Sequence, residues 1–147
     1  MTHAETAIAT FNEHYNCSQA MLSTYAQELG LERAQALKIA TAFGGGMGRL
    51  ADTCGAVTGA FMALGLKYGM VNAADQAAKE KTYALVQEFA AQFRERYGAL
   101  DCRDLLGCDL SAPDGLQIAR EQQLFTTRCP QLIFTATEIL DELLARA

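Results

Sequence analysis

Four of the five cysteines stand where the sequence predicts the start of a helix. They lie far apart along the chain, at Cys17, Cys54, Cys102 and Cys129. A helix N-terminus offers unpaired N–H groups and the positive end of the helix dipole, and both favour a thiolate over a thiol. If these four ends converge, we expect nucleophilic, redox or metal-ligand chemistry from the sulfur atoms.

The residues around these cysteines support the predicted helix starts. The first three cysteines each follow a good N-cap residue, namely Asn16, Thr53 and Asp101. Pro130 is favoured in the first turn of a helix, which places Cys129 itself at the cap position. The fifth cysteine, Cys108, lacks such a context, and we predict that it is incidental.

Four thiolates in one place suit an iron–sulfur cluster or a four-cysteine metal site, because both require deprotonated sulfur and surroundings that compensate its charge. The spacing of the cysteines alone gives no metal signature, since C-x-x-C, zinc-ribbon and ferredoxin patterns are all missing. The absence of C-x-x-C-H excludes haem of the c type. Cysteine is also a common buried core residue, and the residues alone leave that alternative open.

A glycine-rich run, GGGMGR at 44–49, precedes Cys54. Glycine allows the backbone to adopt positive φ and to turn N–H groups toward an anion, a cofactor or cluster sulfurs. On this basis the candidate cofactor-binding residues are Gly45, Gly46, Gly48 and Gly55. A tight crossing of helices would explain the same glycines, and Arg49 would suit either an anion or solvent. The run matches neither a phosphate-binding P-loop nor a Rossmann fingerprint.

The composition narrows the class of protein further. The chain has 147 residues, 50% of them hydrophobic, which suits one domain spanning 1–147. A net charge of −5 and the absence of any Lys/Arg run argue against nucleic acid as a partner. No signal-peptide pattern or membrane-length apolar stretch appears, so we predict a soluble cytoplasmic protein without a membrane partner. The two histidines, His3 and His14, are predicted to be surface residues and cannot readily supply a hydrolase triad.

The elements that must position the cysteines are predicted to be helices, because strand-type alternation is missing and apolar residues recur at helical spacing. We predict an all-α, single-domain bundle of about five to seven helices. The expected helical ranges are 4–15 and 17–29, as two helices or one bent helix, followed by 31–43, 53–68, 72–97 and 130–147, with a short helix at 101–106 and a short helical turn at 116–125. The range 53–68 is apolar nearly all round, which is typical of a central buried helix.

The chain resembles a family of redox-active proteins labelled C_GCAxxG_C_C. The motif here is CGAVTG at 54–59, and the other cysteines stand in NCSQA, CRDLLG and RCP. The resemblance spans nearly the whole chain and implies a redox group such as an iron–sulfur cluster. The chain is also similar to the non-haem part of split-Soret cytochromes, which are dimeric, but only the cysteine part of that likeness carries over. Cys108 departs from the family pattern and is a possible partner of Cys102.

Three hypotheses follow. The leading one is that Cys17, Cys54, Cys102 and Cys129 bind one iron–sulfur cluster for electron transfer or redox sensing with a redox partner protein. The second is thiol–disulfide chemistry in which Cys54 attacks, with its pKa lowered by its helix start and the glycine run. The third is a structural four-cysteine zinc site or a plain helical interaction module. A homodimer is expected in each case.

Overall fold

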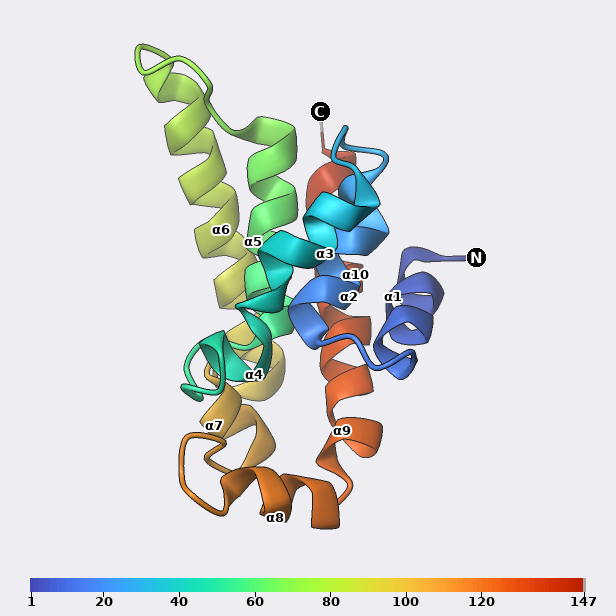
Figure 1. The fold of residues 1–147 in the computed structure, drawn as a ribbon. Coiled ribbons are helices and arrows are strands. Elements are labelled where there is room, and N and C mark those ends of the chain that lie inside the picture. Colours follow the sequence, from blue (N-terminus) through green and yellow to red (C-terminus); the bar gives the residue numbers. More distant parts are fainter. Residues whose placement is uncertain (147) are drawn as a thin grey trace.

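The computed structural model describes residues 1–146, and every regular element in that range is a helix (Figure 1). The six longer helices are α1 (His3–Asn12), α2 (Cys17–Ala26), α3 (Arg33–Thr41), α5 (Gly55–Tyr68), α6 (Gln76–Tyr97) and α10 (Cys129–Ala145). The shorter ones are α4 (Gly44–Met47), α7 (Cys102–Leu106), α8 (Gly115–Glu121) and α9 (Leu124–Thr127). The predicted all-α, single-domain bundle is confirmed.

The differences from the predicted ranges have local causes. The first two predicted helices are separate, and His14 between them has a φ of 78°. Helix α6 begins later than expected because the Asp75 side chain accepts a hydrogen bond from the Ala78 N–H and caps the helix there. The range predicted as one helix at 116–125 is broken by Gln123, whose φ is 57°. Figure 1 shows the short segments α4, α7, α8 and α9 gathered at one end of the bundle.

Helix α5 is the centre of the molecule. It packs against α2, α6 and α10, and its residues from Gly55 to Ala60 are all buried. Figure 1 shows α6 alongside α5, with α2 and α10 on the other side. This burial on every side explains why the sequence of α5 is apolar nearly all round. Within residues 1–146 no helix combines the length and the apolar character that a membrane span requires.

The crossing of α2 and α5 depends on two glycines of the CGAVTG motif. A Cβ atom added at Gly59 would lie 2.6 Å from the Met21 Cβ, and one added at Gly55 would lie 2.9 Å from the Ser18 backbone nitrogen. The two glycines are four residues apart, so they lie on the same face of α5. Any larger side chain there would push α2 away from α5, and Cys17 with it.

Replacement of Gly59 by alanine tests this crossing. We expect Gly59→Ala to lower the free energy of unfolding by about 1–3 kcal/mol, because the added methyl group has no room. The matched control is Gly65→Ala on the same helix, where a Cβ meets nothing within 4 Å. That variant should gain up to about 1 kcal/mol from helix propensity. Urea unfolding measures both, and equal effects of the two substitutions would contradict the role of Gly59.

His3 ties three helices together at the N-terminal end of the chain. Its Nδ1 lies 2.6 Å from an Asp141 oxygen of α10, and its Nε2 lies 2.6 Å from a Glu28 oxygen just after α2. Partial burial acts to lower the pKa of His3, but the hydrogen bonds to Glu28 and Asp141 outweigh it and raise the pKa above 6.5. The Tyr25 hydroxyl donates to the same Asp141 oxygen at 2.7 Å. The prediction that His3 is a plain surface residue therefore misses its structural role.

This arrangement makes part of the stability depend on pH. Because the folded-state pKa of His3 is raised, its contribution is complete below pH 6.5 and is lost as pH rises through the folded-state pKa. We expect His3→Gln to cost more stability at pH 5.5 than at pH 8.5, by less than about 1 kcal/mol for this partly exposed group. Urea unfolding at the two pH values measures this, with His14→Gln as the control. If the stability lost in His3→Gln did not change with pH, a charged His3 would not be what links Glu28 and Asp141.

Candidate functional site: a four-cysteine cavity

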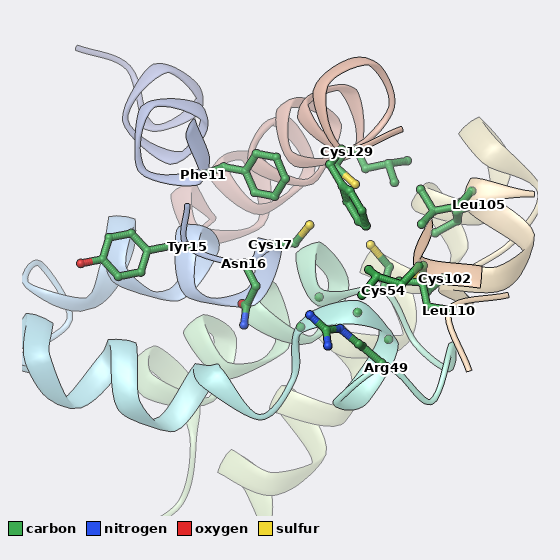
Figure 2. A pocket seen from close by; sticks show the side chains of 18 of the residues that line it. Phe11, Tyr15, Asn16, Cys17, Arg49, Cys54, Cys102, Leu105, Leu110 and Cys129 are labelled. Atoms are coloured by element: carbon green, nitrogen blue, oxygen red, sulfur yellow. The ribbon is translucent and has the colours of Figure 1, made fainter. Parts of the chain in front are cut away.

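A cavity of about 630 Å³ opens at the end of the bundle where the short segments gather. Its walls come from the connection between α1 and α2, from α4, α7, α8 and α9, and from the starts of α5 and α10. The cysteines that line it are Cys17, Cys54, Cys102 and Cys129. Figure 2 shows these four side chains around one cavity, each brought there by a different element. The cysteines that the sequence singles out are thus placed together.

The cysteines stand near helix starts as expected, but in different positions relative to the caps. Cys17 is the first residue of α2, and Asn16 caps it through a reciprocal capping box with Gln19. Cys54 is itself the N-cap residue of α5, so the prediction that Thr53 caps this helix is wrong. Cys129 is the first residue of α10 and Arg128 occupies the cap position, so the predicted cap role of Cys129 is also wrong.

A short antiparallel bridge brings the second and third cysteines together. Thr53 pairs with Asp101, the Cys54 N–H donates to the Leu100 carbonyl at 2.8 Å, and the Cys102 N–H donates to the Asp52 carbonyl at 2.6 Å. Asp101 precedes α7 as predicted, but its side chain accepts no capping hydrogen bond. Backbone pairing therefore sets the position of Cys102, and the helix-start pattern of the sequence gave no sign of it.

Burial decides the protonation of Cys54 and Cys102. Burial, together with a smaller effect of the neighbouring cysteines, raises the pKa of each thiol to about 12. The N–H groups of Ala56 and Val57 do act to lower the pKa of Cys54, as a helix start should, but burial outweighs them. The expectation that the pKa of Cys54 is lowered is therefore wrong, and without a bound cation this sulfur is protonated at neutral pH.

The group that favours a thiolate is Cys129. The interaction between the Cys17 and Cys129 side chains lowers the pKa of Cys129 and raises that of Cys17. The Arg128 guanidinium lowers the pKa of Cys129 further. Arg128 is held in place by its Nε, which donates to the Leu105 carbonyl at 3.0 Å, and by the Tyr97 ring 4.9 Å away. Sequence reasoning missed Arg128, because nothing in the pattern distinguishes it from a surface arginine.

The glycine run forms one wall of the cavity. Gly45, Gly46 and Gly48 all line it, as does Gly55. Five consecutive residues, from Gly45 to Arg49, have φ between 64° and 70°, so the segment is a left-handed turn. Met47 and Arg49 adopt this conformation at a cost of about 1–2 kcal/mol each. The candidate cofactor-binding glycines are thus at the cavity, and whether they contact a cofactor stays a prediction.

The geometry of the glycine run supports both explanations for it, close packing of the backbone and N–H groups that are free to bind a ligand. A Cβ at Gly46 would lie 2.7 Å from the Cys102 Cβ and 2.7 Å from the Asp52 backbone nitrogen, so glycine is required for close approach. The backbone N–H groups of Gly44, Gly45 and Gly46 donate no hydrogen bond to any residue in the range 1–146. These three N–H groups are therefore available donors beside the cysteines.

Cys108 lies outside the cavity lining. It is buried, and its thiol donates a hydrogen bond to the Gly115 carbonyl at 3.1 Å. It is near enough to Cys102 to contribute to the raised pKa of that thiol. All five cysteines are free thiols, so the pairing of Cys102 with Cys108 is not formed. Across residues 1–146, no three His, Cys, Asp or Glu side chains lie close enough to share a single metal ion.

The fold and the site define a class: a small all-α protein in which four distant cysteines line one cavity. The sequence pattern of the family described as "Putative redox-active protein (C_GCAxxG_C_C)" matches residues 15–143. The chain belongs to this family. A search of curated proteins and a search of solved structures each found no match.

The Cys17–Cys129 contact predicts an order of thiol reactivity. In reduced, metal-free protein at pH 8, Cys17→Ala removes the interaction that favours the Cys129 thiolate. We expect alkylation of Cys129 by iodoacetamide to slow by about tenfold, as for loss of one polar interaction with a charged group. Peptide mapping by mass spectrometry measures the rate, and Cys108→Ala, outside the cavity, is the control. An unchanged Cys129 rate in Cys17→Ala would show that Cys17 does not support this thiolate.

Proposed function

We propose that Cys17, Cys54, Cys102 and Cys129 together hold an iron–sulfur cluster, and that the protein serves electron transfer or redox sensing. One observation carries this proposal: all four side chains line one cavity. Burial is the main cause of the raised pKa values of Cys54 and Cys102, and the neighbouring sulfurs add to it through their charge repulsion. A positively charged group bound among the four would reverse this repulsion and favour thiolates.

The residues present fit a cluster of several metal atoms. Cysteine is the usual ligand of such clusters, and four cysteines complete the common ligand set. A single zinc ion with Zn–S bonds of about 2.3 Å would draw its sulfurs to about 3.8 Å from one another. No three potential ligands in the described part of the chain are so grouped. In a cluster, by contrast, each cysteine binds a different metal atom, and four cysteines around one cavity suit that arrangement.

A bound cluster would supply reversible one-electron transfer, and the protein would set its potential. The groups that can do so are present on two sides of the site. The N–H groups of Ala56 and Val57 at the start of α5 act to lower the pKa of Cys54, and the Arg128 charge acts on both Cys54 and Cys129. Hydrogen bonds and positive charge near cluster sulfurs favour the reduced state, because reduction adds negative charge.

A second candidate function is thiol–disulfide exchange, which the contact between Cys17 and Cys129 favours. In this reaction the Cys129 thiolate would attack a partner disulfide and release the first partner sulfur as a thiolate. Cys17 would then close an internal disulfide and release the second partner sulfur, which takes the Cys17 proton and leaves as a thiol, so that two electrons pass to the partner. The pair assigned here is Cys17 and Cys129, because the pKa of Cys54 is raised. The redox partner protein, the cytoplasmic location and the homodimer stay predictions from the sequence.

Metal analysis of protein purified without oxygen tests the cluster. We expect iron and acid-labile sulfide in equal amounts together with visible absorption. Serine replacement of any one of Cys17, Cys54, Cys102 and Cys129 should lower the iron content severalfold, because each variant lacks a ligand. Cys108→Ser is the matched control and should keep its iron, since Cys108 is buried but lies outside the cavity lining.

Each contrary result would favour a different function for the four cysteines. Wild-type protein with neither iron nor sulfide would overturn the cluster, and a colourless protein with zinc would identify the structural zinc site instead. Metal-free protein in which Cys17 and Cys129 form a reversible disulfide would establish thiol–disulfide exchange. Circular dichroism of each variant separates loss of a ligand from loss of the fold.

A further inference from the structure

The cavity has an unusual charge for this protein. The chain carries a net charge of −5, yet no Asp or Glu lines the cavity, while Arg49 and Arg120 do. Neither arginine side chain forms an ion pair or a hydrogen bond with any residue between 1 and 146. Elsewhere in residues 1–146, Arg96, Arg103 and Arg146 pair with carboxylates, whereas Arg33 and Arg94 form no ion pair. Two guanidinium groups without a partner therefore face a cavity that lacks negative side chains.

Backbone donors add to this positive character. The three unpaired N–H groups of Gly44, Gly45 and Gly46 belong to the same wall as Arg49. The Arg49 side chain folds back over Gly45, since a Cβ there would lie 2.9 Å from the Arg49 Cγ. Figure 2 shows the Arg49 guanidinium beside the cavity, on the same side as the glycine turn. Guanidinium and backbone N–H groups together are the donors that bind carboxylate and phosphate oxygens.

The remaining lining is mixed. Its apolar side chains include Phe11, Leu110, Leu116 and Phe125, and polar side chains such as Asn16 lie among them. The Phe11 ring is directed into the cavity in Figure 2. The volume of about 630 Å³ falls within the range of small-molecule sites, which are mainly apolar with a few placed polar groups. A ligand with one anionic end and an apolar body would satisfy both kinds of wall.

We propose that this cavity is a binding site for a small carboxylate with an apolar body, held at its charged end by Arg49 and Arg120. A carboxylate is preferred because the planar guanidinium fork matches it with two parallel hydrogen bonds. The bound molecule lies beside the four sulfurs, so it is the substrate or effector of the redox site. That last assignment rests on the proposed function, whereas binding itself depends on residues other than the cysteines.

Benzoate and its neutral analogue benzamide are the probes. Calorimetry and amide NMR of the purified protein should show saturable benzoate binding, with benzamide at least about tenfold weaker because it lacks the charge. Arg49→Gln and Arg120→Gln should each weaken benzoate at least about fivefold. Arg94→Gln is the matched control, an exposed arginine on α6 outside the cavity, and it should bind benzoate as the wild type does. Higher salt should weaken binding as well.

Three results would overturn the proposal: equal binding of benzoate and benzamide, wild-type affinity in both Arg49→Gln and Arg120→Gln, or no saturable binding. Inorganic phosphate that displaces benzoate at an equal concentration would overturn the requirement for an apolar body. Iron and sulfide are measured on the same samples. Benzoate binding without iron would retain the anion site and reject the cluster. Iron without benzoate binding would retain the cluster and reject the anion site.

Discussion

Four sulfurs that share one cavity create an electrostatic constraint on which the rest of the structure depends. Cys54, Cys102 and Cys129 are each less than a tenth exposed, so solvent cannot screen their charges from one another. Neutral thiols can lie together in such a cavity without charge repulsion, and burial keeps Cys54 and Cys102 protonated. As thiolates they need a compensating charge. The Arg128 guanidinium, the N–H groups at the start of α5 and the absence of carboxylates from the cavity all reduce the cost of that negative charge.

Glycine is what allows the backbone to come so close around these sulfurs. Gly55 faces the Cys17 Cβ at 3.1 Å, and Gly46 faces the Cys102 Cβ at 2.7 Å, measured from an added Cβ. One glycine thus fits α5 against the first cysteine, and the other fits the left-handed turn against the third. The CGAVTG motif is therefore a packing motif as well as the source of a ligand candidate. This double role explains why cysteine and glycine are adjacent in it.

The sequence predicted the all-α fold correctly, because apolar periodicity is a local property, and helix starts singled out the four cysteines that the structure places at one cavity. It failed where distant segments meet. The pKa of Cys54 depends on burial by other helices, so its own cap could not reveal the direction of the shift. The role of Arg128 depends on the Tyr97 ring and the Leu105 carbonyl, which no local pattern connects to it. The bridge between Thr53 and Asp101 was likewise beyond local reasoning.

That bridge joins the two halves of the chain, and it has a consequence for how the protein matures. Two of the cavity cysteines precede residue 55 and two follow residue 101, with the last at the start of the final helix. Contacts between such distant positions require a large loop to close, which is slow compared with the formation of single helices. On the ribosome, the final helix must emerge before Cys129 can reach the other three sulfurs. Any group that needs all four sulfurs is therefore inserted only after Cys129 and the helix that it begins have been synthesised.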